Sequence, residues 1–286
     1  MKFALSDNNR IEATKGAKGI CPGCGSELIA KCGERKINHW AHTGNRTCDP
    51  WWEPETEWHR SWKNNYSIEW QEVVLHNEQT GEKHIADIFT IHGLVIEFQH
   101  SHIDPQERTS RENFYKNMVW IVDGTRLKRD YSRFLKAKID FLQTNNKGVY
   151  FVDYPDEKFP ENWLHSSVPV IFDFKGLETI DDINDNRQYL YCLFPERVGR
   201  YAIIAEISRK AFLKTTNDGN WSLRVQKFID DVIRPKQEQQ KNIILLQQLK
   251  KRLSTLRYGQ LRGPLIEYIE KKQFSNQYKP KRRGRR

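Results

Sequence analysis

Residues 85–101, IADIFTIHGLVIEFQHS, consist of two mostly apolar runs on either side of a His-Gly pair. Apolar and β-branched runs around such a turn signal predict a β-hairpin. Asp87, Glu97 and Gln99 interrupt the runs, and Glu97 and Gln99 share one face of their strand because side chains alternate. A hairpin with one apolar face must place these polar groups either toward solvent or toward a ligand.

The length of the connection decides where the two carboxylates lie. A two-residue turn would place Asp87 and Glu97 on opposite faces of the hairpin. A three-residue loop with Gly93 in the left-handed conformation pairs Thr90 with Leu94 and places Asp87 directly opposite Glu97. The three-residue loop also gathers the apolar side chains on the other face, so we expect this register.

Two carboxylates opposite each other, about 5 Å apart between their Cβ atoms, repel unless a cation compensates them. Mg²⁺ and Mn²⁺ accept hard oxygen ligands, polarise a phosphoryl oxygen and make a bound water nucleophilic. We therefore interpret Asp87 and Glu97 as a candidate Mg²⁺ or Mn²⁺ site for phosphodiester hydrolysis. The alternative is a pair of solvent-facing acids beside lysine or arginine.

The segments around the hairpin predict the order α-β-β-β-α-β-α. The second helix is expected to begin with Asp104 as N-cap and Pro105 in the first position. The last helix is amphipathic, with Tyr131, Phe134, Leu135 and Ile139 on its apolar side. The expected elements are helix 54–64, strands 67–75, 84–90 and 94–99, helix 104–117, strand 118–124 and helix 127–142.

Two of these helices carry polar side chains at helical spacing. Glu55, His59 and Lys63 are spaced by four and share one face of helix 54–64, from which they could complete a metal shell, orient water or hold a phosphate. The alternative is a solvated salt-bridge ladder. In helix 104–117, Arg111 and Tyr115 are also four apart and could contact a DNA backbone or simply pack.

The cysteines indicate a second metal site. Four of the five cysteines lie in the first fifty residues, three of them within CPGCG and the later HWAHTGNRTC, and this clustering in a reducing compartment favours metal over disulfides. Zinc needs four ligands. The alternative is a set of free thiols and a structural histidine. The expected structural zinc ligands are Cys21, Cys24, His42 and Cys48, with His39 as the alternative histidine.

The charge and hydropathy of the sequence limit the kinds of partner that the protein is expected to bind. The formal net charge of +10 favours a polyanion, with nucleic acid first. The sequence has no apolar run of the roughly 18–20 residues that span a bilayer, and MKFALSDNNR lacks the apolar stretch of a signal peptide. We therefore expect a cytoplasmic protein that binds DNA and no membrane.

The chain is expected to divide into five regions. Leu246, Leu249, Leu253 and Leu256 form a seam through which the C-terminal helices could bind a partner or a second copy. The regions are a zinc-finger-like region 1–52, a core 53–145, a strand-rich region 146–220, a helical region 221–278 and a basic, disordered tail 279–286.

The motifs CPGCG, HWAH, ETEWHRSWK, IADIF, VIEFQHS and SRENFYKNMVWIVDG occur in this order, and over about residues 1–125 they resemble the competence protein CoiA-like family. The resemblance implies an α/β (mixed α+β) fold with a zinc-finger-like N-terminus, a PD-(D/E)XK nuclease core of restriction-endonuclease-like αβββαβ order, and a mixed β and helical C-terminal part. By position it makes Asp87 and Glu97 metal ligands. It makes Glu55 and His59 the contribution of the first helix, and Arg111 and Tyr115 the polar pair of the second.

Gln99 stands where the general nuclease pattern has lysine. A neutral amide cannot supply positive charge near the transition state, so Lys63 or a second metal ion is the candidate substitute. The function expected is a metal-dependent DNA nuclease in DNA processing, uptake, recombination or defence against foreign DNA. The alternative is a catalytically inactive nucleic-acid-binding adaptor, or a subunit of a larger complex, that keeps the nuclease fold.

Overall fold

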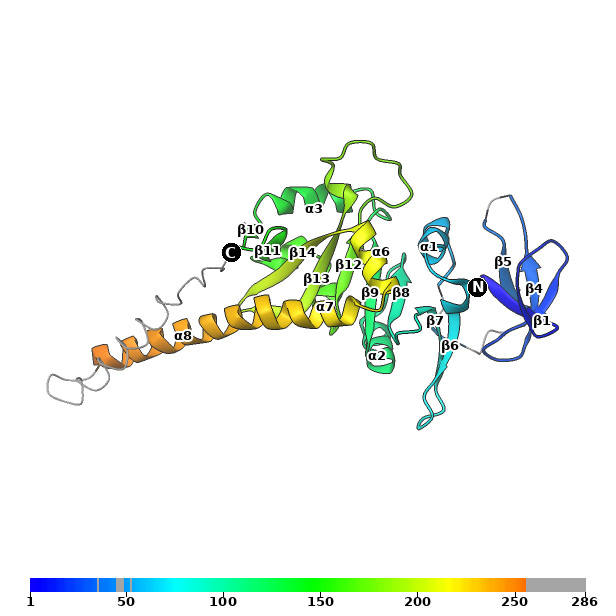
Figure 1. Ribbon diagram of the computed structural model, residues 1–286, viewed down its shortest axis with the longest axis horizontal. Helices are drawn as coiled ribbons and strands as arrows, with labels where there is room; N and C mark the ends of the chain where they lie inside the picture. Colours follow the sequence, from blue (N-terminus) through cyan, green and yellow to red (C-terminus); the bar gives the residue numbers. More distant parts are fainter. Residues whose placement is uncertain (35, 45–48, 52, 256–286) are drawn as a thin grey trace, which may run out of the picture. The chain divides into compact units, whose positions relative to one another are not determined.

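The computed structural model describes residues 1–34, 36–44, 49–51 and 53–255. The chain divides into two compact units, Met1–Phe228 and Ile229–Arg286. The first unit contains two β-sheets and the helices around them (Figure 1).

The smaller sheet is formed by the N-terminal residues. Its strands pair in the order β2-β1-β3-β4-β5, and all pairs are antiparallel. Asp7 and Asn8 both have positive φ, as a two-residue type I′ turn requires, and they connect the first two strands. The strands are β1 (Phe3–Ser6), β2 (Asn9–Glu12), β3 (Lys18–Ile20), β4 (Glu27–Lys31) and β5 (His39–His42). The region expected to be zinc-finger-like is therefore built of short β-strands.

The larger sheet has nine strands among the described residues, in the order β10-β11-β14-β13-β12-β9-β8-β7-β6. The central strands β8, β9 and β12 are parallel, and the other pairs are antiparallel. The strands are β6 (Gln71–His76), β7 (Lys83–Phe89), β8 (Val95–Gln99), β9 (Met118–Asp123), β10 (Leu142–Gln143), β11 (Val149–Val152), β12 (Val170–Asp173), β13 (Tyr189–Val198) and β14 (Tyr201–Ser208).

Helices flank these strands in the chain. The 3₁₀ turns are η1 (Ile68–Trp70) and η2 (Asn186–Gln188). The α-helices of the first unit are α1 (Glu57–Lys63), α2 (Pro105–Tyr115), α3 (Asp130–Lys138), α4 (Pro155–Lys158), α5 (Glu161–Leu164), α6 (Arg209–Asn217) and α7 (Trp221–Phe228). The order α1-β6-β7-β8-α2-β9-α3 confirms the predicted sequence of elements, and Asp104 caps α2 through bonds from the Gln106 and Glu107 backbone N–H groups.

Two helices are shorter than predicted. Thr56 caps α1 in a capping box with His59, so the helix begins at Glu57 and the prediction that Glu55 lies on it is wrong. The helix predicted over 127–142 spans only Asp130–Lys138. Ile139 is 84% exposed and Leu135 is 37% exposed, so the assignment of both to the apolar side is also wrong.

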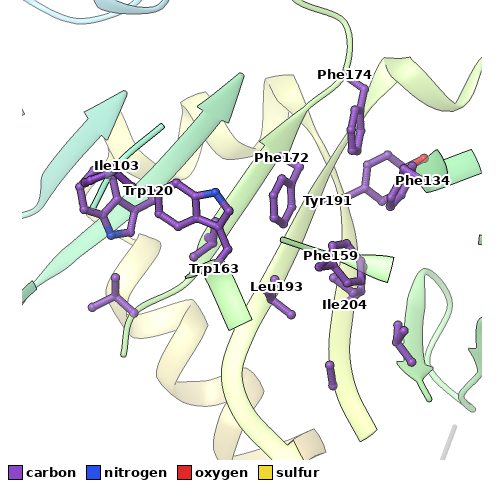
Figure 2. Packing of buried hydrophobic residues seen from close by; sticks show 14 of the residues in the cluster. Ile103, Trp120, Phe134, Phe159, Trp163, Phe172, Phe174, Tyr191, Leu193 and Ile204 are labelled. Atoms are coloured by element: carbon purple, nitrogen blue, oxygen red, sulfur yellow. The ribbon is translucent and has the colours of Figure 1, made fainter. Parts of the chain in front are cut away.

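Aromatic rings fill the main core beside the central strands. Phe134 stacks on Phe174 with a centroid distance of 4.4 Å, and Phe159 lies 5.5 Å from Phe172. Figure 2 shows these rings together with Tyr191, which comes from β13. The strands after residue 145 therefore contribute to the same core as β9.

The second unit contains a π-helical segment, η3 (Ile229–Ile233), followed by α8 (Arg234–Thr255). Leu246 and Leu249 are partly exposed on α8. The side chain of Leu253, the whole of Leu256 and the tail 279–286 lie outside what the structure describes. Within the described residues, no helix has the length and apolar character needed to cross a bilayer.

Candidate functional site

The β7–β8 hairpin has the register that the three-residue loop predicts. Ile88 pairs with Ile96, which places Asp87 opposite Glu97. Gly93 has a φ of 75°, and the Thr90 N–H donates to the Leu94 carbonyl over 2.9 Å. This pairing confirms the predicted register. The physical reason for the register is that it buries the apolar face of the hairpin.

Around Asp87 and Glu97, hydrogen bonds from the backbone to carboxylate side chains replace the usual hydrogen bonds between the two backbones. The Asp87 N–H donates to Glu97 Oε1 over 3.1 Å, and the Phe98 N–H donates to Asp87 Oδ2 over 3.0 Å. Each carboxylate is thus held by a backbone group of the opposite strand. The hairpin opens at this point and keeps both carboxylates in fixed positions.

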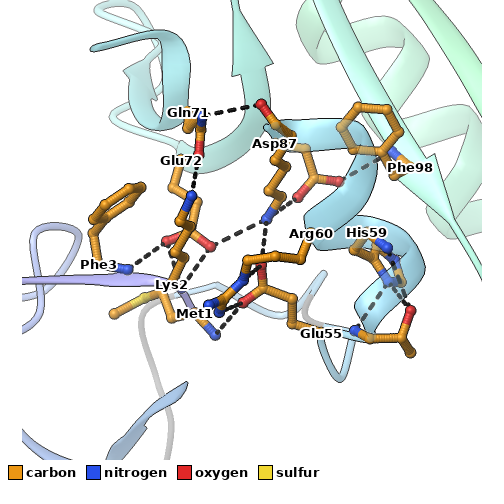
Figure 3. Close-up of polar contacts among 12 residues, drawn as sticks. Met1, Lys2, Phe3, Glu55, His59, Arg60, Gln71, Glu72, Asp87 and Phe98 are labelled. Carbon is orange, nitrogen blue, oxygen red and sulfur yellow. Dashed lines mark hydrogen bonds and ion pairs between the residues drawn. The ribbon is translucent and has the colours of Figure 1, made fainter. Parts of the chain in front are cut away.

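Lys63, at the end of α1, places a buried ammonium among three carboxylates. Its Nζ lies 2.8 Å from Asp87 Oδ1, 3.1 Å from Glu72 Oε1 and 3.6 Å from Glu55 Oε1. Figure 3 shows Glu55, Glu72 and Asp87 directed toward one another. Burial alone would lower the pKa of Lys63, but the three carboxylates outweigh it and raise the pKa well above its usual range.

Glu72 is a member of this cluster that sequence reasoning missed. It has a φ of 49° at the beginning of β6, a strained conformation for a glutamate. Its carboxylate accepts the Lys2 N–H at 2.7 Å and the Phe3 N–H at 3.0 Å. Burial opposes its ionisation, but Lys63 and the backbone donors lower the pKa of Glu72 to about 2. No periodicity in the sequence marks a residue that leaves the regular strand conformation.

Glu97 has its own cationic partner. Arg111 Nη1 donates to Glu97 Oε2 over 2.9 Å, and Nη2 donates to Glu107 and to the Trp51 carbonyl. Burial and the nearby Asp87 raise the pKa of Glu97 to about 8, although Arg111 opposes this. Arg111 is 6% exposed, so its guanidinium positions Glu97 instead of facing an external DNA backbone.

His59 connects the site to a second carboxylate that the sequence did not reveal. Its Nδ1 lies 2.8 Å from Thr56 Oγ1, and its Nε2 lies 3.6 Å from Glu53 Oε2. Glu53 also accepts the backbone N–H groups of His100 and Ser101. Burial opposes the ionisation of Glu53, but His59 and Ser101 keep its pKa below its usual range.

These side chains surround a cavity of about 70 Å³. Gln99 does not line it. The Gln99 amide donates to the Ser101 carbonyl over 3.2 Å, and its buried Oε1 has no hydrogen-bond partner within the described residues. The predicted site residues that line the cavity are Glu55, His59, Lys63, Asp87, Glu97, Arg111 and Tyr115.

The donor set of this cavity fits a divalent cation. Asp87 and Glu97 offer carboxylate oxygens. Burial first, and the nearby Asp87 second, raise the pKa of Glu97 to about 8, and a dication between the two acids would favour the ionised form of both. Mg²⁺ commonly uses one or two protein carboxylates and keeps several waters. The two acids therefore provide the number of protein ligands that this ion requires.

The N-terminal sheet carries the second candidate metal centre. The ligand atoms of Cys21, Cys24 and His42 lie within 4.8 Å of one another, and this is the one such group of three among the described residues. Cys24 Sγ lies 3.4 Å from His42 Nε2. Burial alone would raise the pKa of the Cys24 thiol, but hydrogen bonds from Ser26 and His42 lower it to about 6. A low pKa favours the thiolate that binds metal.

The structure distinguishes between the two candidate histidines but does not describe the fourth candidate ligand. His39 Nδ1 lies 2.9 Å from the Ile37 carbonyl, outside the cluster, so His42 is the histidine that the structure groups with the cysteines. Cys48 lies outside the described residues.

Two segments of the chain match models of known protein families. Residues 4–50 match the family described as "Competence protein CoiA, N-terminal domain", and residues 72–171 match "Competence protein CoiA, nuclease-like domain". The competence protein CoiA of Bacillus subtilis (strain 168) is 29% identical over 162 residues, which are 52% of this chain and 43% of that protein. The chain thus aligns with less than half of that relative's length. No solved structure matches the chain.

The nuclease-like match covers the β6–β8 strands, α2 and β9, the part of the fold in which the open hairpin presents its acids. With α1 in front of these strands, the order is that of a restriction-endonuclease-like αβββαβ core. The chain therefore belongs to the competence protein CoiA-like family.

Proposed function

We propose that the chain is a metal-dependent nuclease that hydrolyses DNA phosphodiester bonds. One observation carries the proposal: Asp87 faces Glu97 across an opened hairpin, and the Lys63 ammonium lies 2.8 Å from Asp87. Two carboxylates beside a lysine are the groups that metal-assisted phosphodiester hydrolysis needs. The nuclease-like match and the net charge of +10 support a nucleic-acid substrate.

Each group has a distinct role in this proposal. Asp87 and Glu97 would hold Mg²⁺ or Mn²⁺, which when bound polarises a phosphoryl oxygen and activates water. Lys63 supplies the positive charge that Gln99 cannot, and Glu55 and Glu72 keep it in place. We propose DNA uptake, recombination or defence against foreign DNA as the setting for this chemistry.

The first test is cleavage of circular single-stranded and supercoiled double-stranded DNA with Mg²⁺, Mn²⁺ or EDTA. Glu97→Gln is the matched variant, because glutamine keeps an oxygen that can accept the Asp87 N–H. We expect metal-dependent cutting of circles and a loss of about 10²-fold or more in the variant, since removal of one charge-stabilising group costs that much. Cutting by the variant at the rate of the unaltered chain would contradict the proposal.

A DNA-binding adaptor without turnover is the second candidate. It is favoured by the neutral Gln99 and by the donors that already occupy the carboxylate oxygens of Asp87 and Glu97. An adaptor would bind DNA in a salt-dependent way, because phosphate contacts release counterions. It would give no product with any divalent metal, so the same assay separates the two candidates.

We propose structural zinc at Cys21, Cys24 and His42, with Cys48 as the fourth ligand. Cys21→Ser should reduce bound zinc from about one ion per chain to nearly none and lower the melting temperature, because such an ion stabilises a small domain. Atomic absorption and thermal melts measure both effects. Cys32→Ser is the control, because the Cys32 thiol donates to the Ala13 carbonyl outside the cluster. Equal zinc loss in both variants would contradict the assignment.

A further inference from the structure

A cavity of about 690 Å³ lies at the carboxyl ends of the parallel strands β8, β9 and β12, and the acid site does not use it. Its wall includes residues 100–103 after β8, Asp123 and Gly124 at the end of β9, and Phe174 after β12. In open sheets with parallel strands, ligands bind at this end of the strands. A cavity of this size holds a small molecule or one nucleotide.

Aromatic side chains form much of this wall. Trp163, Phe134, Phe159, Phe172 and Phe174 all line the cavity. Figure 2 shows their rings gathered in one cluster beside the strands. Ring faces and edges of this kind accept a flat aromatic group such as a nucleobase, without selecting among bases.

Several basic side chains in the wall of this cavity have no acidic side chain beside them. The wall acids lie beside basic groups: Asp123 is 2.7 Å from His100, Asp130 is 3.2 Å from Arg133, and Glu161 is 3.9 Å from His165. Arg126, Lys158 and His102 also line the cavity, and among the described residues no acid lies within ion-pair distance of them. These cations are complementary to a phosphate at the mouth of the cavity.

The cavity is joined to the acid site by a short stretch of chain. His100 follows Glu97 by three residues, a path of about 10 Å along an extended strand. The Glu53 carboxylate accepts the His100 and Ser101 N–H groups and lies 3.6 Å from His59 of the acid site. The cavity and the acid site are therefore neighbours, separated by only a few residues of the chain.

We propose that this cavity binds one unpaired nucleotide of the nucleic-acid strand that passes the acid site. The base inserts against the aromatic wall, and its phosphate contacts Arg126 and Lys158. A base inside a duplex is stacked and paired and cannot enter, so the cavity selects single-stranded segments or frayed ends. The inference rests on the nuclease function proposed above, for which it names the substrate class.

The test is binding of the full chain to a labelled single strand, to the blunt duplex of the same length and to a deoxynucleoside monophosphate. No Mg²⁺ or Mn²⁺ is added, so that the strand is not cut, and no chelator is used, so that the proposed zinc stays bound. The variant Arg126→Ala/Lys158→Ala should bind the single strand about tenfold more weakly and the duplex nearly unchanged. Arg129→Ala/Lys147→Ala is the matched control, because both side chains are exposed and lie outside the cavity. A 2-aminopurine in the strand should lose fluorescence on binding, because its base stacks.

Circular dichroism of both double variants checks that they are folded, and we expect spectra that match that of the unaltered chain. Equal weakening on single strand and duplex would show general attraction and overturn the proposal, as would a cavity variant that matches the control. Binding of the free monophosphate as tight as that of the strand would also overturn it, because the cavity would then serve a free nucleotide. Single-strand selectivity without cleavage in the metal assay would disprove the nuclease and keep the cavity assignment.

Discussion

Replacement of Lys63 by methionine should lower the free energy of unfolding by about 3–5 kcal/mol, the usual cost of removing one partner from a buried ion cluster. Lys63 is 3% exposed, and its ammonium is shared by Glu55, Glu72 and Asp87. Without it these carboxylates repel one another in a site with little water. Urea denaturation measures the change, and DNA cleavage should fall by about 10²-fold or more in the same variant.

A second substitution separates the two effects of Lys63. Lys63→Met/Glu72→Gln removes one of the repelling charges, so part of the lost stability should return. Cleavage should stay low, because no ammonium is left beside Asp87. If cleavage returns together with stability, Lys63 serves the fold alone and the catalytic role assigned to it is wrong.

Asp173→Ala should have an effect of similar size on stability, about 3–5 kcal/mol. Asp173 is fully buried on β12, and its Oδ2 accepts the indole N–H groups of Trp58 and Trp62, each at 3.0 Å. Arg209 of α6 also donates to this carboxylate. The substitution removes the acceptor of all three groups and loosens α1, which carries Lys63.

Urea denaturation again gives the stability change, and cleavage should decrease with it. Asp153→Ala is the matched control: Asp153 pairs with the exposed Arg200, and such surface pairs contribute less than about 1 kcal/mol. Equal losses in the two variants would show that the buried network does not fix α1.

The sequence was most informative where local rules act. Gly93 and the apolar alternation determined the hairpin register, and with it the meeting of Asp87 and Glu97. Asp104 before Pro105 marked the beginning of α2 correctly. These features depend on a few neighbouring residues, so propensity and spacing suffice to predict them.

Long-range contacts could not be predicted in the same way. Glu72 enters the site through a left-handed backbone and bonds to residues 2 and 3, about seventy positions earlier. Glu53 precedes the first helix and lies outside any periodic pattern. The capping box at Thr56 shortened α1 and left Glu55 before it, yet the fold still brings Glu55 to Lys63. Contacts of this kind are set by the three-dimensional fold and leave no local pattern in the sequence.

The parallel pairing of β9 with β12 has a consequence for dissecting this protein. The nuclease-like match ends at residue 171, inside β12, and Val170 and Ile171 pair with Trp120 and Ile121 of β9. A fragment cut before β12 would turn β9, which is buried except for the half-buried Val122, into a bare sheet edge, with unpaired backbone groups and apolar side chains open to other molecules. We expect such a fragment to aggregate, so the smallest useful piece of the nuclease-like region must carry its sheet through to β14.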